Sequence, residues 1–287
     1  MFTFYAFTLK YILFFLVYRL IYVSLHGQSI EMILNISIIG AGNVAYHLVK
    51  ALCKQAEVHL VQLYSRGETP KDFEHFPVER VHDFSLLRSV DICILAVKDD
   101  AIAEVSRQLP YSGGLVVHTS GNTPMEAIDP KHRRGVFYPL QSFSIGSSID
   151  FEQIPICLEA EHKSDMESLL KPLAGLLSSK IYELNGYQRR MLHVAAVFAN
   201  NFTNHLIALS EGICKENHIP FEILQPLISG TFEKLEHLDP VKAQTGPARR
   251  NDAQTIGEHL GLLSGERRKI YEIITDSIIK TYEREKL

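Results

Sequence analysis

Small residues recur at a fixed spacing directly after the first run of the chain that is typical of a strand. Gly40, Gly42 and Ala45 form a Gly-x-Gly-x-x-Ala pattern, and helical spacing of apolar residues begins at Val44. The first glycine permits a sharp turn, the second lets a diphosphate approach the backbone, and the alanine lets the helix pack against the strand. Free N–H groups at the helix start, Asn43 included, would face the phosphates, so the pattern predicts a dinucleotide site. An ordinary strand–helix turn is the alternative.

The end of the second predicted strand, residues 58–64, indicates which nucleotide is bound. In NAD sites an Asp or Glu about 20 residues after the glycines accepts hydrogen bonds from the ribose 2′-hydroxyl. Here Ser65 and Arg66 occupy that strand end. A hydroxyl can donate to a 2′-phosphate and a guanidinium can pair with it, so the sequence favours NADP over NAD as the cofactor. An exposed loop cation is the alternative interpretation of Arg66.

The strand predicted at residues 90–97 should deliver further residues to the cofactor. It is apolar on both faces, as a central parallel strand is. Because ligands bind at the carboxyl ends of the strands in a doubly wound sheet, we expect Val97 and Lys98 to line the nicotinamide ribose. We expect one of the two aspartates that follow, Asp99 or Asp100, to cap the next helix rather than to act in catalysis.

Two more strand ends carry hydroxyl groups. A strand at residues 114–118 leads to Ser120, and a strand that begins at residue 135 leads to a polar loop at residues 138–142. Both loops should lie at the edge where ligands bind, so Ser120 is a candidate substrate-binding residue beside the nicotinamide. Ordinary turn chemistry is the alternative, because serine and glycine favour turns in any protein.

One long helical pattern, residues 187–217, carries uncharged polar residues on a face that would normally be charged. His193 and Asn200 fall on this face with Arg189 and Asn204. Such a face suits the wall of a cleft between domains, which makes His193 a candidate general acid or base and Asn200 a residue that orients the substrate or His193. A hydrogen-bonded core histidine or a dimer contact is the alternative. The opposite side, which we expect to be core, consists of Met191, Ala195, Phe198, Phe202 and Leu209.

A second cluster of charged residues lies closer to the carboxyl terminus. Arg249, Arg250 and Asp252 come together just before a predicted helix. The guanidinium groups could hold a carboxylate or a phosphate, so these three are candidate substrate-binding residues. A capped helix start, with Asp252 as the cap, is the alternative.

The order of these elements predicts the fold class. Strand and helix patterns alternate from residue 32 to residue 185, and only helical patterns follow from residue 186 to residue 287. We therefore expect an α/β protein, with a Rossmann doubly wound parallel sheet followed by a smaller all-α domain for substrate binding and dimerisation. A chain of 287 residues is long enough for both domains.

Composition narrows the classes of function. The net charge of −4 gives no indication of nucleic-acid binding. The four cysteines stand alone in the sequence, so neither a disulfide framework nor a zinc site is predicted, and we expect no metal. Isolated thiols are typical of a reducing compartment, and we expect the protein in the cytoplasm.

Residues 1–31 do not continue this pattern. They are rich in aromatic and aliphatic residues, but Lys10 and Arg19 interrupt them, and the uncharged stretch at residues 11–18 is far too short to span a membrane. A secretory signal would carry its positive charge before the apolar run. Because Met32 stands directly before the first strand, we interpret residues 1–31 as an over-extended start. A membrane tether at residues 1–25 or an additional packed helix is the alternative.

Seven short motifs together resemble a known oxidoreductase family that has a Rossmann-like N-terminal domain and a helical C-terminal domain of unknown function. The motifs are residues 40–45, 64–66, 96–99, 118–121, 138–140, 193–201 and 245–252, of which the last two are the specific ones. The resemblance covers residues 32–285. It extends more loosely to pyrroline-5-carboxylate reductases, to deazaflavin-dependent NADP oxidoreductases and to 6-phosphogluconate dehydrogenase-like enzymes.

The resemblance implies a nicotinamide cofactor and a homodimer through the C-terminal helices, but no substrate. Many β-hydroxyacid dehydrogenases of this superfamily carry a catalytic lysine on the long interdomain helix, followed by an asparagine four residues later. Here there is no lysine between residues 191 and 210. Lysine-assisted alcohol oxidation is therefore not expected.

Two hypotheses about function follow from the sequence. In the first, the protein is an NADP-dependent oxidoreductase that transfers hydride between NADP(H) and an unidentified small molecule. In the second, it is a sensor or scaffold protein that binds NADP without catalysis. The second hypothesis shares the glycine turn but needs no role for His193.

Overall fold

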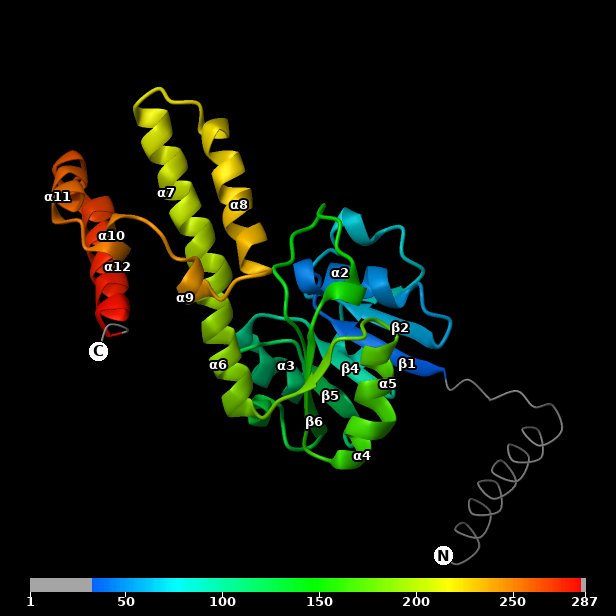
Figure 1. The fold of residues 1–287 in the computed structure, drawn as a ribbon. Helices are drawn as coiled ribbons and strands as arrows, with labels where there is room; N and C mark the ends of the chain where they lie inside the picture. The colour runs from blue at the N-terminus through cyan, green and yellow to red at the C-terminus, as the bar shows by residue number, and fades with distance from the viewer. Residues whose placement is uncertain (1–32, 285–287) are drawn as a thin grey trace, which may run out of the picture. The chain divides into compact units, whose positions relative to one another are not determined.

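The structure, a computed structural model, describes residues 33–284, so the interpretations of residues 1–31 lie outside the described residues. Contacts divide the chain into two compact units, one that ends at Ala195 and one that begins at Ala196. Figure 1 traces the strands and helices of both units. The boundary falls at the end of α6 (Gly186–Ala196), so nearly all of this helix belongs to the first unit.

An eight-stranded sheet forms the centre of the first unit. Its strands are β1 (Leu34–Ile39), β2 (Val58–Tyr64), β3 (Glu79–Val81), β4 (Ile92–Leu95), β5 (Leu115–His118), β6 (Arg133–Pro139), β7 (Ile156–Ala160) and β8 (Ile181–Glu183). Their order is β3-β2-β1-β4-β5-β6-β7-β8, and neighbours are parallel except β6 and β7. The order reverses between β1 and β4, which is the position where a doubly wound sheet binds its ligand.

Helices cover both faces of this sheet. One face packs against α2 (Asn43–Leu52) and against a helical segment in which α4 (Lys163–Asp165) continues through a π-helical turn (Met166–Leu170) into α5 (Lys171–Gly175). The other face packs against α3 (Ile102–Gln108). Two separate clusters of buried side chains result, because successive side chains of a strand point to opposite faces. The predicted α/β fold with a doubly wound, mostly parallel sheet is confirmed.

The structure contains one strand that the sequence pattern did not predict. β3 lies in the connection between residues 68 and 84, where it is preceded by a 3₁₀ turn (Lys71–Phe73) and followed by another (Phe84–Leu86). Three residues are too few to show an alternation of apolar and polar side chains. Its pairing with β2 depends on the sheet that is already present.

The second unit is entirely helical in the part of the chain that the structure describes. It begins with a π-helical segment (Val197–Phe202) that continues α6 into α7 (Thr203–Glu216). The helices that follow are α8 (Gln225–Leu235), α9 (Pro240–Ala243), α10 (Pro247–Arg250), α11 (Ala253–Leu262) and α12 (Gly265–Arg284). The predicted all-α C-terminal part is confirmed, and none of the described helices is long and apolar enough to cross a membrane.

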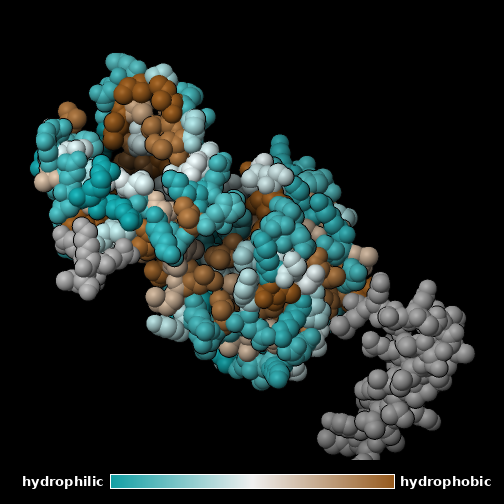
Figure 2. Space-filling view, viewed as in Figure 1, coloured by the Kyte–Doolittle hydropathy of each residue, from teal (hydrophilic) through white to brown (hydrophobic). Residues whose placement is uncertain are grey.

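The side of the long helix that we expected to be core is exposed. Met191, Phe198 and Phe202 keep 49, 65 and 49% of their accessible surface, Ala195 is exposed as well, and Leu209 is only partly buried. Figure 2 shows apolar side chains gathered over α7 and α8. The predicted core was therefore wrong within the described chain, because a helical period marks an apolar face but does not identify what covers it.

Candidate functional site

The turn after β1 has the geometry that a dinucleotide site requires. Gly40 adopts a φ of +120°, and a Cβ atom placed there would lie 2.2 Å from the carbonyl oxygen of Ala96, so no other residue fits. Gly42 precedes the first residue of α2, and nothing lies within 4 Å of the position that its Cβ would take. Ala45 is fully buried against the sheet.

The first turn of α2 is free of groups that would compete with an anion. Gly42 caps the helix without a side chain, and the first turn contains no acidic residue. The N–H groups of Asn43 and Val44 are therefore at a positive helix end that no carboxylate neutralises. The side chain of Asn43 itself donates to the carbonyl oxygen of Phe143 at 2.9 Å, so it holds the loop after β6 against the helix start.

The end of β2 presents one free cation. Ser65 is buried, and its hydroxyl donates to the carbonyl oxygen of Gly67 at 2.8 Å, with Thr69 and His82 also within hydrogen-bond distance. Arg66 is exposed and forms no hydrogen bond or ion pair with another residue between 33 and 284. Ser65 thus stabilises the loop, whereas Arg66 is available to bind a phosphate from solution.

The end of β4 lies beside the glycine turn. A Cβ atom at Gly40 would be 3.3 Å from Cγ1 of Val97, so this side chain adjoins the turn, and Lys98 follows it as an exposed cation. The prediction for Asp99 and Asp100 was wrong, because α3 begins at Ile102 and no side chain caps it. A 3₁₀ turn occupies residues 99–101, and the carboxylate of Asp99 accepts a hydrogen bond from a side chain instead of from the N–H groups of α3.

The side-chain partner of Asp99 is Ser120, in the loop after β5. The Ser120 hydroxyl donates to Oδ2 of Asp99 at 2.8 Å and accepts from the backbone N–H groups of Asn122 and Thr123 at 3.1 and 2.9 Å. Ser120 is 7% exposed, so its hydroxyl connects the ends of β4 and β5 rather than projecting freely. The ends of β4 and β5 therefore lie close together. Because the Ser120 hydroxyl already donates one hydrogen bond and accepts two, it serves the turn, which is the alternative interpretation.

His193 is paired with a residue that the sequence analysis did not select. The hydroxyl of Tyr138, on β6, lies 3.2 Å from Nδ1 of His193. A Cβ atom at Gly121 would lie 2.7 Å from that nitrogen and 2.8 Å from the Tyr138 hydroxyl, so only a glycine leaves room for the pair. Burial is the main cause that raises the pKa of Tyr138, to about 12. The phenol is therefore uncharged at neutral pH and can donate or accept a hydrogen bond.

Arg189, one helical turn before His193, fixes α6 to the sheet edge. Its side chain is 1% exposed, and one guanidinium nitrogen donates to the carbonyl oxygens of Ser120, Gly121 and Thr123 at 3.0, 3.2 and 2.7 Å. The other side of the guanidinium pairs with Glu159 at 3.0 Å. The sequence analysis placed Arg189 on the polar face with His193, but nothing in the sequence pointed to Glu159 as its partner.

His118 is a neutral histidine beneath this loop. It is fully buried, and its Nδ1 accepts from the backbone N–H of Ser120 at 3.2 Å. Burial lowers its pKa to about 4, and the positive charge of Arg189 acts in the same direction. Nδ1 is therefore unprotonated, and His118 supports the loop in its uncharged form.

The other predicted site residues lie in the second unit. Asn200 is exposed in the π-helical segment. Arg249 donates to the carbonyl oxygen of Val241 at 3.0 Å and stacks over the ring of Tyr282, so its side chain is already used within the fold. Arg250 is exposed, and Asp252 caps α11 by accepting from the Thr255 N–H at 3.1 Å, as the alternative interpretation predicted. This capping lowers the pKa of Asp252.

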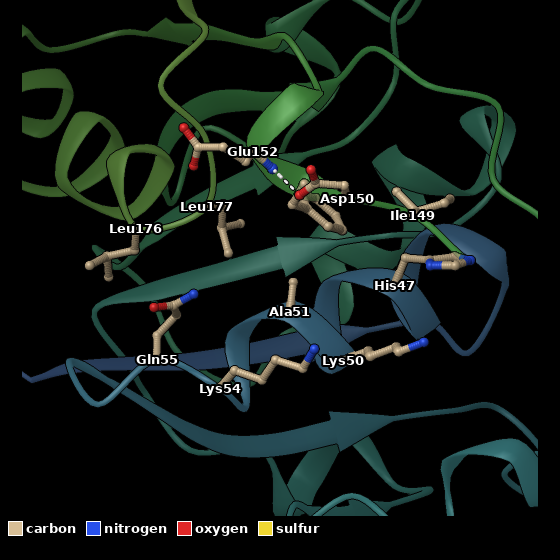
Figure 3. Close-up of a pocket in the computed structure, with 11 residues that line it drawn as sticks. His47, Lys50, Ala51, Lys54, Gln55, Ile149, Asp150, Glu152, Leu176 and Leu177 are labelled. Atoms are coloured by element: carbon tan, nitrogen blue, oxygen red, sulfur yellow. Dashed lines mark hydrogen bonds between the residues drawn. The ribbon is translucent and has the colours of Figure 1, made fainter. Parts of the chain in front are cut away.

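A depression of about 250 Å³ lies beside residues 47–55, at the C-terminal half of α2 (Figure 3). Lys50 and Lys54 of α2 line it together with Asp150 and Glu152. No residue between 40 and 45 lines it, and its positive and negative side chains balance. It is therefore distinct from the predicted dinucleotide site at residues 40–45, and it has no net charge that would select an ion.

Comparison with known proteins agrees with this geometry. Residues 154–278 match a family model described as a domain of unknown function, DUF2520. A crystal structure from Bacteroides fragilis, described as a "putative NADP oxidoreductase", shares 37% sequence identity and a TM-score of 0.79, over 88% of this chain and 100% of that one. The chain belongs to the family of this Bacteroides fragilis protein. No match was found among curated proteins.

More distant structures share the fold. A protein from Thermotoga maritima is 21% identical over 88% of this chain and 100% of its own, with a TM-score of 0.68. Pyrroline carboxylate reductase from Plasmodium falciparum, solved with NADP bound, is 11% identical over 88% of this chain and 98% of its own, with a TM-score of 0.57. These likenesses extend over both units and confirm the family's fold.

Removing the Arg189 guanidinium should destabilise the protein strongly. In Arg189→Met the carboxylate of Glu159 and three loop carbonyls lose their partner, and breaking a buried ion pair in this way costs about 3–5 kcal/mol. Urea unfolding measures the loss. Arg190→Met, a change at the exposed neighbouring arginine, is the control, and an Arg189→Met protein as stable as this control would contradict the structural role.

His118 should make stability depend on pH. Because its folded pKa of about 4 lies below the ordinary value of 6.5, the unfolded chain takes up a proton in this interval that the folded protein does not. The free energy of unfolding should therefore fall as the pH decreases from 6.5 to 4, by roughly 3 kcal/mol from this group. His118→Asn should lose this part of the pH dependence in urea titrations. His75→Asn, at an exposed histidine, should keep it.

Proposed function

We propose that the protein is an NADP-dependent oxidoreductase that transfers hydride between NADP(H) and a small molecule. The observation that carries the proposal is the turn at Gly40 and Gly42. Close packing excludes any side chain at Gly40, and open space lies beside Gly42. This turn precedes the uncapped positive end of a ten-residue helix. The description of the Bacteroides fragilis relative as an NADP oxidoreductase supports the same cofactor.

The cofactor would extend along the carboxyl edge of the sheet. Its diphosphate would bind the N–H groups at the start of α2, and its 2′-phosphate would pair with Arg66. Its nicotinamide ribose would lie beside Val97 and Lys98, at the point where the strand order reverses. The bound cofactor would supply the hydride, while the chain orients it.

The proton that accompanies the hydride would be exchanged by His193. Imidazole is suited to this role, because one ring nitrogen can give or take a proton while the other keeps its hydrogen bond. Within the first unit, the Ser120 hydroxyl binds Asp99 at the end of β4, and the next residue, Gly121, adjoins Tyr138 of β6. The Tyr138 hydroxyl lies 3.2 Å from Nδ1 of His193. Asn200 and Arg250 remain candidates for contacts to the substrate.

The proposed assembly is a homodimer in the cytoplasm, formed through the C-terminal helices. Exposed apolar side chains of α7 and α8 support it, among them Leu206, Ile213, Leu227 and Phe232. Apolar surface of this extent is typical of a face that a protein partner covers. The isolated cysteines support a reducing compartment.

Fluorescence titration tests the cofactor. The protein should bind NADPH more tightly than NADH, and Arg66→Gln should weaken NADPH binding by about tenfold, the loss of one charge-assisted contact, without changing NADH binding. Arg107→Gln, at an exposed arginine of α3, is the matched control. If wild-type protein binds neither reduced coenzyme, the proposal fails.

A turnover screen separates the enzyme from a sensor. Purified protein with NADPH should reduce at least one member of a panel of small imines and ketones, or with NADP⁺ oxidise a hydroxy acid, as followed by absorbance of the reduced cofactor. In His193→Gln, turnover should fall by about 100-fold or more while NADPH binding persists. Tight NADPH binding without turnover of any panel member would favour the sensor hypothesis instead.

A further inference from the structure

The pairing of Tyr138 with His193 bears on how a proton is exchanged. We infer that Tyr138 is a positioning residue, whose hydroxyl oxygen accepts a hydrogen bond from Nδ1–H of His193 and so makes Nε2 the nitrogen that exchanges protons with the substrate. The inference rests on the proposed function and gives a role to Tyr138, which the sequence placed only within a loop at the ligand-binding edge. It concerns contacts within the first unit alone.

Three separate segments converge to build this pair. Tyr138 comes from β6, His193 from α6 and Gly121 from the loop after β5, where a Cβ atom would overlap both rings. The Tyr138 hydroxyl has no hydrogen-bond partner other than His193 within residues 33–284, and Nε2 of His193 has none in the same range. One ring nitrogen is thus held by the protein and the other is left for a ligand.

The buried ion pair of Arg189 and Glu159 holds the Tyr138–His193 pair in place without forming a hydrogen bond to either ring. Arg189 binds the backbone of Ser120, Gly121 and Thr123, which holds the glycine against the two rings. Its charge is paired with Glu159, so the guanidinium is not free to take a proton-transfer role. An arginine is almost never fully buried unless it is paired, and Arg189 is paired with Glu159 and with the loop carbonyls.

The direction of the hydrogen bond decides which nitrogen reacts. When Nδ1–H donates to the Tyr138 oxygen, the neutral ring has its lone pair on Nε2 and the charged ring has its second proton there. When bound, the cofactor would supply the hydride to the substrate carbon. In a reduction, Nε2 of a charged His193 would give its proton to the substrate oxygen or nitrogen. His193 is left neutral with Nδ1–H still bonded to Tyr138, and solvent returns a proton to Nε2. During oxidation the same atoms act in reverse.

Nitrogen NMR of the full-length protein tests this without any substrate. The chain has 13 histidines, so the signals of His193 are assigned as those that disappear in His193→Gln. At a pH where the ring is neutral, wild type should show Nδ1 protonated and Nε2 unprotonated. Tyr138→Phe keeps the ring volume and removes the oxygen, and it should lose this preference. An unchanged tautomer in Tyr138→Phe, or a wild-type ring protonated on Nε2, would overturn the inference.

Kinetics provide the second readout. With a substrate found in the screen, Tyr138→Phe should lower kcat by about tenfold and leave KM for NADPH unchanged, because the tautomer and not the cofactor site is affected. Tyr111→Phe is the matched control, because the Tyr111 hydroxyl is also buried in the first unit but forms no hydrogen bond with His193. Loss of kcat in both variants, or in neither, would contradict the positioning role.

The two failures are distinguishable. If no reduced coenzyme binds, the proposed function fails. The NMR experiment needs no coenzyme, so it still tests whether Tyr138 sets the tautomer of His193. If NADPH binds and turnover occurs but Tyr138→Phe matches wild type in tautomer and in kcat, the inference fails and the proposed function remains. Thermal unfolding of each variant confirms that a loss of kcat does not come from unfolded protein.

Discussion

The buried guanidinium of Arg189 is the interaction on which the arrangement of the candidate site depends. It lies on α6, yet its hydrogen bonds go to the loop after β5 and to Glu159 on β7. A charge held away from water is costly unless every donor is used, and here the donors have carbonyl or carboxylate partners. The helix that carries His193 therefore has one favourable position against the edge of the sheet.

The glycine turn imposes a second constraint of a different kind. At Gly40 the limit is steric, because the backbone of β1 approaches that of β4 so closely that a Cβ atom would meet a carbonyl oxygen. The same approach brings the end of β4, with Val97, next to the start of α2. Close packing thus places the positive end of α2 beside the carboxyl end of β4. The same packing therefore positions both the phosphate-binding end and the nicotinamide end of the proposed site.

Much of the fold could be predicted because its signals are local. The turn from Gly40 to Ala45 and strand β2, at residues 58–64, follow from spacing and from apolar runs. Strand β3 could not be predicted, because three residues carry no period and pair only when β2 is in place. The capping role of Asp99 was misjudged for a related reason: the partner that it takes, Ser120, is 21 residues away along the chain.

The residues of the candidate site also differ in how well the sequence alone could predict them. Ser65 and Arg66 look equivalent in the sequence, but only the structure shows that the serine hydroxyl is used within its own loop while the arginine is free. His193 could be selected from the absence of charge around it on a helix. Its partner Tyr138 could not, because the contact joins positions 55 residues apart, and a tyrosine near a strand end is common.

The groups proposed for hydride and for proton exchange both belong to the first unit. The glycine turn, Val97, Tyr138 and His193 all precede Ala196, and every contact that positions them is made by residues of that unit. The relation between the cofactor edge and the acid–base group is therefore set by the sheet and by Arg189. Asn200 and Arg250, by contrast, belong to the second unit, and none of the hydrogen bonds that position Tyr138, His193 and Arg189 involves them.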